Sequence, residues 1–305
     1  MTALLTSTSF RSLGGQISIQ AEGEGSDRAV AEAEAIIHDL HDRLTRFEPD
    51  SELCRLNDDP RTSVPASRLM MRFAQLVRHA GEQTGGLVDA TLLDQVERAG
   101  YVESIDPDAG LPASMKPVGT APAEPVNGAW SDVSVDLAAS SVTRPPGLRL
   151  DSGGLGKGLA ADLVAEHLGG FVTWGIVCAG DLRFGGTSRA PRRIDITSPD
   201  GTGTVIAEFT APAGSVATSG ITRRSWEGGS GRSHHLIDPR TGEPADTGLL
   251  QVSAVAPTAA EAEIRAKAAL LSGPENASEW LPDGGAIVTE NNELRTFGPV
   301  KESNR

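Results

Sequence analysis

Cysteines, basic residues, aromatic residues and long apolar runs are all scarce in this 305-residue chain. The two cysteines, Cys54 and Cys178, lie far apart and form no CxxC pair, so the sequence indicates neither a zinc site nor a disulfide framework. No stretch approaches the roughly 18 apolar residues that a membrane-spanning helix needs. The segment from Met1 to Gly25 lacks the basic and apolar regions of a signal peptide. These absences predict a cytoplasmic protein without a membrane span.

The shortage of basic residues argues against one broad class of partner. Lys and Arg total 27 against 41 Asp and Glu, which gives a formal charge of −14. A negative protein repels the phosphate backbone of a nucleic acid, so general nucleic-acid binding is disfavoured. A nucleotide ligand is compatible with this charge, because its few phosphates need only local backbone amides, a cation or a metal ion.

The composition and the first periodic segments favour a mixed fold. An aromatic content of 4%, with 35 glycines and 19 prolines, suits an α/β or α+β protein better than a helical bundle. Between Gly14 and Ala21, the apolar Ile17 and Ile19 alternate with polar neighbours, which predicts a half-buried strand. Apolar residues at three- and four-residue steps predict a long helix after Ser26 and a second helix over about 67–80.

From Val133 onward, short β-like runs alternate with glycine turns and helices, which predicts a sheet with helices packed on it. The predicted strands read VSVDLA, LRLD, TWGIVCAG, VIAEFTA and LQVSAVAP, and the helices lie near Leu159–Leu168 and Glu261–Leu271. Between Tyr101 and Trp130 there are several prolines and little periodicity, so we place a long surface excursion there.

The stretch from Leu150 to Leu168 reads LDSGGLGKGLAADLVAEHL. It predicts a strand that ends at Asp151, a glycine-rich turn, and a helix that begins near Lys157. Glycines let backbone N–H groups approach phosphate oxygens, and a helix N-terminus adds partial positive charge, so such a turn can hold an anion. The spacing matches neither the P-loop nor the GxGxxG fingerprint. A plain structural connection is the alternative interpretation.

A second polar cluster, SHHLIDPRTGEP, runs from Ser233 to Pro244 and follows ATSG at 217–220. His235 is a candidate general acid or base, since imidazole titrates near neutral pH. Asp238 is expected either to orient that histidine or to cap the turn. The alternative is a tight turn from Asp238 to Gly242 with half-buried histidines beside it. The density of polar groups next to ATSG favours a functional site.

Three further segments are ambiguous in isolation. TGGLVDATL joins two glycines to a carboxylate and a threonine at a turn-to-helix boundary, and the alternative is helix capping by Asp89 or Thr91. FEPDSELCRLN offers Ser51 as a helix cap and Asn57 as a polar tip, and the alternative is a loop followed by one short helix.

The third ambiguous segment is the late helix TAAEAEIRAKAALL, which places Glu263 and Lys267 four residues apart. Periodicity alone indicates an ordinary exposed ion pair there, worth a few tenths of a kcal/mol.

Taken in order, these motifs resemble the ApbE family. The matching segments are SELCRLN at Ser51–Asn57, TGGLVDATL at Thr84–Leu92, AGY at Ala99–Tyr101, DSGGLGKGLAAD at Asp151–Asp162, AGDLRFGG at Ala179–Gly186, ATSG at Ala217–Gly220 and HHLIDPRTG at His234–Gly242. The resemblance covers about Leu13 to Ser272. It implies one mixed α+β unit whose two lobes hold FAD between them. We expect this domain to span residues 11–297, with short tails at 1–10 and 298–305.

The resemblance implies a FAD:protein FMN transferase. In such an enzyme a Thr or Ser hydroxyl of an acceptor protein attacks the FMN phosphate of FAD, and AMP leaves. By motif, the predicted FAD contacts are Phe47, Ala99, Gly100, Tyr101, Asp151, Lys157 and Ile237. His235 falls at the position of the family's proposed base and would accept the proton of the attacking hydroxyl.

The chain departs from the family pattern at the cation. Family members place an Asp and, four residues later, a Thr as Mg²⁺ ligands, together with a group in the glycine-rich turn, which here is Gly154. This sequence has Glu263 and Lys267 instead. Glutamate can ligate Mg²⁺, but an ammonium group has no lone pair to donate.

Two interpretations of that departure are open. Lys267 supplies positive charge near the pyrophosphate, in place of one metal ligand or of Mg²⁺ itself, or the site has lost transfer chemistry and kept FAD binding. The retained positive charge favours the first, so Lys267 joins His235 as a predicted catalytic residue. In a second departure, Cys178-Ala179-Gly180-Asp181 replaces the family's Asn-Gly-Gly-Asp. Ala179 has fewer allowed backbone conformations than the glycine that it replaces.

Two other functions fit the same predicted pocket. A FAD pyrophosphatase would use water in place of the protein hydroxyl and release FMN and AMP. A FAD-binding protein without turnover would store or deliver flavin. The sequence names neither the acceptor protein nor the oligomeric state.

Overall fold

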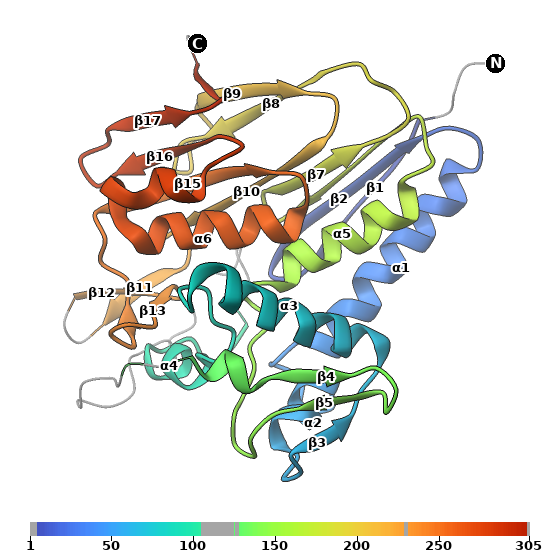
Figure 1. Ribbon diagram of the computed structural model, residues 1–305. Coiled ribbons are helices and arrows are strands. Elements are labelled where there is room, and N and C mark those ends of the chain that lie inside the picture. Colours follow the sequence, from blue (N-terminus) through green and yellow to red (C-terminus); the bar gives the residue numbers. More distant parts are fainter. Residues whose placement is uncertain (1–4, 105–124, 126–127, 229–230, 304–305) are drawn as a thin grey trace. The chain divides into compact units, whose positions relative to one another are not determined.

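The computed structural model describes residues 5–104, 125, 128–228 and 231–303 (Figure 1). The chain divides into two compact units. The first unit comprises Met1–His38, Lys157–Arg223 and Asp246–Arg305, and the second comprises Asp39–Gly156 and Arg224–Ala245. The combination of helices and antiparallel sheets confirms the predicted α+β class. Most of the surface excursion predicted between Tyr101 and Trp130 lies outside the described residues.

An eight-stranded sheet, antiparallel at every pairing, forms the centre of the first unit. In spatial order its strands are β1 (Leu5–Ser12), β2 (Gly15–Glu22), β6 (Thr173–Cys178), β7 (Asp181–Gly185), β10 (Gly214–Gly220), β15 (Leu249–Ala256), β16 (Gly285–Thr289) and β17 (Leu294–Phe297). Ile17 and Ile19 of β2 are fully buried, which confirms the strand predicted from their alternation.

Helices pack on one face of this sheet, as Figure 1 shows for α5 and α6. The helices are α1 (Ser26–Leu44, whose last residues belong to the second unit), α5 (Gly156–Leu168), α6 (Ala259–Asn276) and the short η2 (Ala277–Trp280). Small side chains let α6 lie close to β10 and β15, since Ala262 packs against Ala217 and Ala256. Gly273, at φ 76° and ψ 171°, kinks α6 just before Pro274.

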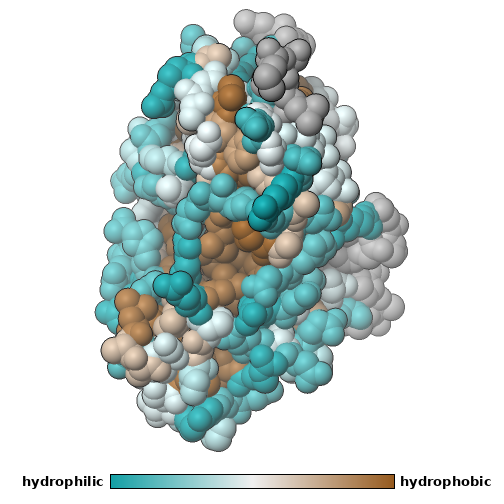
Figure 2. All heavy atoms as spheres, turned by 90° about the vertical axis from the view of Figure 1, so that its right-hand side faces the viewer, coloured by the Kyte–Doolittle hydropathy of each residue, from teal (hydrophilic) through white to brown (hydrophobic). Residues whose placement is uncertain are grey.

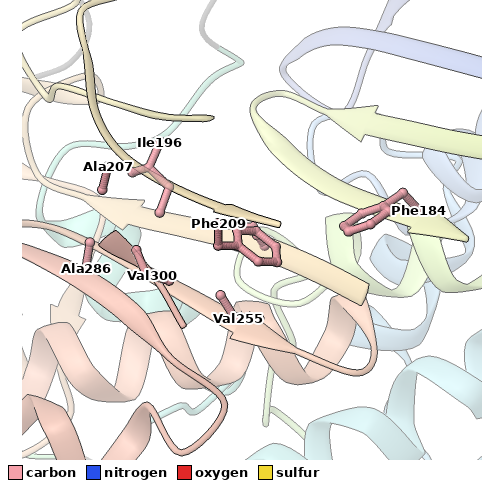
Figure 3. Close-up of a cluster of buried hydrophobic side chains, with 8 residues drawn as sticks. Phe184, Ile196, Ala207, Phe209, Val255, Ala286 and Val300 are labelled. Carbon is pink, nitrogen blue, oxygen red and sulfur yellow. The ribbon is translucent and has the colours of Figure 1, made fainter. Parts of the chain in front are cut away.

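A small three-stranded sheet covers the other face. It consists of β18 (Lys301–Glu302), β9 (Val205–Ala211) and β8 (Arg192–Thr197) in that order. Its apolar side chains join Phe184, Val216, Val255 and Ala286 of the large sheet in one buried cluster (Figure 3). Val216 belongs to this cluster whereas the next residue, Ala217, faces α6, so β10 contributes to both sides of the large sheet.

Strands at both chain ends belong to the first unit. β1 begins at Leu5 and pairs along its full length with β2. β18 pairs with β9 through Lys301 and Glu302. Strand pairing therefore continues into the segments that the sequence suggested as tails.

The second unit is built from short elements. They are α2 (Glu52–Asp58), β3 (Ser63–Pro65), α3 (Arg68–Thr84), α4 (Leu93–Arg98), η1 (Ala129–Asp132), β4 (Ser134–Asp136), β5 (Ser141–Thr143), β11 (Ser225–Gly228), β12 (Gly231–His234), β13 (Ile237–Asp238) and β14 (Glu243–Pro244). β3, β5 and β4 form one sheet, and β11–β12 and β13–β14 form hairpins. Ser51 and Ser67 cap α2 and α3 through their side chains, and Gly85, at φ 59°, ends α3.

Three local predictions for the second unit are wrong. The run LRLD forms no strand; instead, the Asn57 side-chain amide binds both backbone groups of Leu150, with Nδ2–O and Oδ1–N distances of 2.9 and 2.8 Å. Asn57 is thus a buried bridge and not a polar tip. Asp89 does not cap a helix either: its Oδ1 accepts hydrogen bonds from the backbone N–H and the hydroxyl of Thr91, which closes a local turn.

Arg144 is the largest fully buried side chain of the chain's described part. Its Nη2 donates to the backbone carbonyls of Leu56, Asn57 and Asp59 at the end of α2, and its Nη1 donates to that of Pro145. Burial lowers the pKa of this guanidinium below its ordinary value. The side chain therefore supplies donors to carbonyls at the end of the short helix α2, of which that of Leu56 also accepts the Asp59 N–H.

Among the described residues, no helix is both long and apolar enough to cross a membrane. On the face seen in Figure 2, hydrophilic residues cover most of the surface and hydrophobic residues gather mainly in the middle.

Candidate functional site

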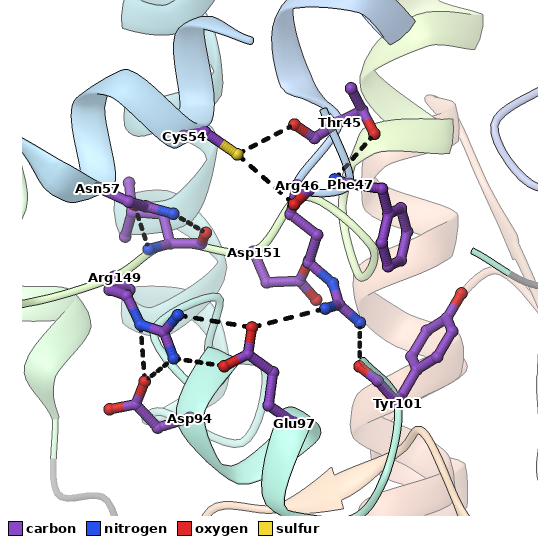
Figure 4. Close-up of polar contacts among 11 residues, drawn as sticks. Thr45, Arg46, Phe47, Cys54, Asn57, Asp94, Glu97, Tyr101, Arg149 and Asp151 are labelled. Carbon is purple, nitrogen blue, oxygen red and sulfur yellow. Dashed lines mark hydrogen bonds and ion pairs between the residues drawn. The ribbon is translucent and has the colours of Figure 1, made fainter. Parts of the chain in front are cut away.

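A cluster of aromatic and charged side chains in the second unit contains several of the predicted flavin contacts (Figure 4). The Arg46 guanidinium carbon lies 4.3 Å from the ring centroid of Phe47 and 4.7 Å from that of Tyr101. The two rings are 5.8 Å apart and tilted by 57°. We call Arg46, Phe47, Tyr101 and Asp151 the aromatic cluster. It places two π faces beside a fixed positive charge.

Ion pairs and a hydrogen bond hold Arg46 in position. Its Nη2 donates to the backbone carbonyl of Tyr101 at 2.5 Å, and its Nε lies 3.4 Å from Asp151 Oδ1. Its Nη1 is 3.8 Å from Glu97 Oε1, and Glu97 in turn pairs with Arg149 at 2.6 Å. Only 5% of the Arg46 side chain is exposed, so removing it would leave Asp151 without this buried partner.

The segment Ala99–Tyr101 follows the short helix α4. Gly100 adopts φ 107°, a conformation that favours glycine and turns the chain sharply between its two neighbours. The carbonyl of Ala99 accepts hydrogen bonds from Trp226 Nε1 at 2.9 Å and from the Ser233 hydroxyl at 3.2 Å. Hairpin β11–β12 is thereby attached to the AGY motif.

His235 lies next to Tyr101, with ring centroids 6.5 Å apart in an edge-to-face arrangement. Its Nδ1 is 3.4 Å from the backbone carbonyl of Arg224. A carbonyl can only accept, so Nδ1 is the donor in this contact, and in the neutral ring the lone pair is then on Nε2. The neighbouring His234 has the opposite assignment, because its Nδ1 accepts from the Leu236 N–H while its Nε2 faces the carbonyl of Ala245 at 2.9 Å.

Asp238 has the turn role that the sequence offered as one of its two alternatives. Its carboxylate accepts from the backbone N–H and the guanidinium of Arg240. Its own carbonyl accepts from the N–H groups of Thr241 and Gly242. Ile237 packs with Trp226 in a small apolar core to which Tyr101 also adds its ring.

A second cluster, in the first unit, consists of Lys157, Asp181, Glu263 and Lys267; we call it the charge cluster. Lys157, on the first turn of α5, is in direct contact with the Asp181 carboxylate and lies 3.7 Å from Glu263 Oε1. Lys267 Nζ lies 3.1 Å from that same Oε1. The four formal charges sum to zero.

The expectation of an ordinary exposed Glu263–Lys267 ion pair is wrong. Glu263 is 1% exposed, and 12% of the Lys267 side chain is exposed. Burial lowers the pKa of Lys267, and the adjacent Glu263 carboxylate opposes that shift. Glu263 Oε2 accepts the backbone N–H of Gly158 at 2.8 Å. A carboxylate that is bonded through both oxygens favours the charged form of the lysine beside it.

The donor set around Glu263 does not fit Mg²⁺. Both of its oxygens are engaged, and Asp181 is engaged likewise, through Lys157 and through the Thr218 N–H at 2.8 Å. Mg²⁺ requires oxygen ligands in near-octahedral geometry, and Lys267 offers an ammonium group instead. Charges of +2 and +1 about 4 Å apart repel by roughly 8 kcal/mol at an effective dielectric constant of about 20. Gly154, the other predicted metal ligand, is half-buried in the turn before α5, in the second unit.

Gly158 permits the close contact between α5 and α6. A Cβ at this position would lie 2.6 Å from Ala260 Cα and 2.9 Å from the Ala259 carbonyl oxygen. Asp162, one turn later on α5, accepts the N–H groups of Ala259 and Ala260, each at 2.9 Å. The start of α6 is therefore held by α5, and Glu263 with it.

We expect Gly158→Ala to destabilise the protein by about 1–3 kcal/mol, because the added methyl collides with backbone atoms that cannot rotate away. Thermal and urea unfolding measure this loss. Gly156→Ala is the matched control, since its Cβ would meet nothing closer than 3.6 Å. Equal stability of the two variants would contradict the close packing of the helices.

The turn between β6 and β7 leads directly to Asp181. Ala179 adopts φ 51°, in the left-handed region, where a non-glycine residue costs about 1 kcal/mol. A Cβ on Gly15 would lie 2.5 Å from the Cβ of Ala179, so Gly15 is what makes room for this side chain. Burial raises the pKa of the Cys178 thiol to about 12, which keeps it protonated at neutral pH.

The predicted site residues thus fall into two groups. Within the second unit lie Phe47, Ala99, Gly100, Tyr101, Asp151, Gly154, His235 and Ile237, and within the first unit lie Lys157, Glu263 and Lys267. Sequence reasoning gave no site role to Arg46, Trp226 or Asp181, which make central contacts in the two clusters. The position of Arg46 directly before Phe47 and that of Asp181 within AGDLRFGG were the available signals.

Curated relatives match most of the chain. A protein of Klebsiella pneumoniae named FAD:protein FMN transferase is 30% identical over 281 residues, which cover 87% of this chain and 78% of that protein. The Escherichia coli K12 protein of the same name is 28% identical over 257 residues, covering 80% of this chain and 71% of the relative.

Solved structures share the fold. An ApbE protein of Thermotoga maritima superposes with a TM-score of 0.79 at 21% identity, over 96% of each chain. A flavin transferase ApbE of Vibrio cholerae superposes with a TM-score of 0.74 at 18% identity, over 99% of this chain and 98% of that one. The sequence profile of the ApbE family matches residues 13–288, and the chain therefore belongs to the ApbE family.

Proposed function

We propose that this protein is a FAD:protein FMN transferase, which moves FMN from FAD to a Thr or Ser hydroxyl of an acceptor protein and releases AMP. The curated relatives carry this name, and they match the chain along most of its length. The predicted cytoplasmic location stays a prediction.

The observation that carries the proposal is the gathering of residues distant in sequence around Tyr101. Its ring lies 5.8 Å from Phe47, 6.1 Å from Trp226 and 6.5 Å from His235. Aromatic faces suit the planar rings of a flavin nucleotide, and an imidazole suits proton transfer. The two properties occur together in one compact unit, which supports a site where a flavin nucleotide is both bound and cleaved.

In the proposed reaction, the acceptor hydroxyl oxygen forms a new ester bond to the FMN phosphorus. The pyrophosphate P–O bond breaks, and AMP departs with its electron pair. His235 takes the hydroxyl proton on Nε2, the nitrogen to which its contact with Arg224 assigns the lone pair. We propose that Phe47, Ala99, Gly100, Tyr101, Asp151, Lys157 and Ile237 contact FAD, as their motif positions imply.

The experiment is to incubate the purified protein with FAD and a candidate flavin-acceptor domain, and to follow AMP release together with the intact mass of the denatured acceptor. We expect equal amounts of AMP and of FMN bound covalently to the acceptor. An acceptor in which the target Thr or Ser is replaced by Ala is the control and should gain no mass.

The same experiment distinguishes the two other functions. AMP and free FMN without any gain in acceptor mass would indicate a FAD pyrophosphatase. FAD that stays intact with several acceptor domains would indicate a flavin-binding protein without turnover.

A further inference from the structure

Two lysines of the charge cluster place ammonium groups where the family pattern has a metal ion. Lys157 and Lys267 both approach Glu263 Oε1, at 3.7 and 3.1 Å. They come from different helices, α5 and α6. The two ammonium groups place positive charge beside this buried oxygen, as a bound cation would. An ammonium group carries only hydrogen-bond donors, and it offers no lone pair to a metal ion.

The cluster is held from several sides. Asp181 fixes Lys157 and is itself fixed by the Thr218 N–H, while Gly158 N–H fixes the second oxygen of Glu263. The N-terminus of α5, whose first turn carries Lys157, adds further partial positive charge. Every carboxylate oxygen of the cluster has a donor, so a metal ion would have to displace one of them.

We propose that the ammonium groups of Lys267 and Lys157, and not a metal ion at Glu263, supply the positive charge at this point, so that FMN transfer proceeds without a divalent cation. This inference rests on the proposed function. It assigns to Lys267 the stabilisation of negative charge on the pyrophosphate as its P–O bond breaks.

The first test measures metal binding without any reaction. Mn²⁺, a paramagnetic substitute for Mg²⁺, is titrated into the full-length protein and followed by electron paramagnetic resonance. We expect no stoichiometric Mn²⁺ binding by the wild-type protein. The E263D/K267T variant replaces the lysine by an oxygen ligand and should gain one Mn²⁺ site. E261D/R265T changes another acid–base pair with the same spacing on α6 and should gain none.

The second test compares AMP release and acceptor mass in Mg²⁺ and in EDTA. We expect wild-type rates that agree within about twofold, and an E263D/K267T variant that transfers FMN only with Mg²⁺. Lys267→Met, which removes the charge but keeps much of the volume, should lower the rate in both conditions. Thermal unfolding shows whether each variant is folded.

Two results would overturn the inference. One is wild-type transfer that stops in EDTA and returns with Mg²⁺, which leaves the transferase assignment intact. The other is one equivalent of Mn²⁺ bound by the wild-type protein and lost in Glu263→Gln. If no FMN is transferred under any condition, the proposed function fails, and the Mn²⁺ titration alone still decides the metal question.

Discussion

His235→Ala is expected to slow FMN transfer by about 10²- to 10⁴-fold, the usual contribution of a positioned general base. The affinity for FAD should change little, because the ring contacts of Tyr101 with Phe47 and Trp226 remain. The rate is measured as AMP release at saturating FAD and acceptor, and the affinity from the quenching of flavin fluorescence.

The adjacent His234 is the matched control. It is buried, and both of its ring nitrogens contact the backbone, so its role is structural. We expect His234→Gln to reduce thermal stability and to leave the rate per folded molecule near that of the wild type. A His235→Ala rate within a few-fold of wild type would exclude His235 as the base, and a loss of FAD binding would make it a binding residue instead.

Arg144→Met is expected to lower the free energy of unfolding by about 3–5 kcal/mol. The substitution retains a long side chain in a fully buried position but removes every hydrogen bond donated to the four carbonyls around it. Each buried group left without a partner costs about 1–3 kcal/mol, partly recovered by apolar packing of the methionine. Urea unfolding, followed by tryptophan fluorescence, measures the change.

The control for Arg144 is Arg28→Met on α1. Its side chain is 84% exposed and forms an ion pair with Glu32 one turn later, so stability should stay unchanged within error. If Arg144→Met were as stable as Arg28→Met, the carbonyls at the end of α2 would accept hydrogen bonds from water or from other donors in the variant. The structural role assigned to Arg144 would then be wrong.

Local signals in the sequence predicted the long elements correctly. Helix α3 has an apolar period, a serine cap at Ser67 and a glycine stop at Gly85, and each of these acts within one turn of the chain. β2 alternates over eight residues. Such elements can be predicted because their stabilising contacts lie close together in sequence or repeat at a fixed period.

The contacts that define the site were not accessible in this way. The backbone of Leu150 is hydrogen-bonded by the side chain of Asn57, 93 residues earlier. No pattern near LRLD could have shown that a side chain, and not a neighbouring strand, pairs with this backbone. The Glu263–Lys267 pair has the spacing of a surface ion pair, but it is buried, and Lys157 and Gly158 of another helix contact Glu263 there. Arg46 gives no periodic signal at all, and its importance follows from two rings and a carboxylate distant in sequence.

The division of the chain into five segments determines the order in which the protein can be completed during synthesis. β2 leaves the ribosome early, but its partner β6 follows only after residue 172, when the long second segment has already been made. The second unit is complete only when Arg224–Ala245, which carries His235, has been made. The first unit is complete only when its last strand, Lys301–Glu302, has been made. The first unit therefore cannot complete its sheets before β18 has been made, and the nascent chain keeps the inner edge of the β1–β2 hairpin unpaired for about half of its synthesis.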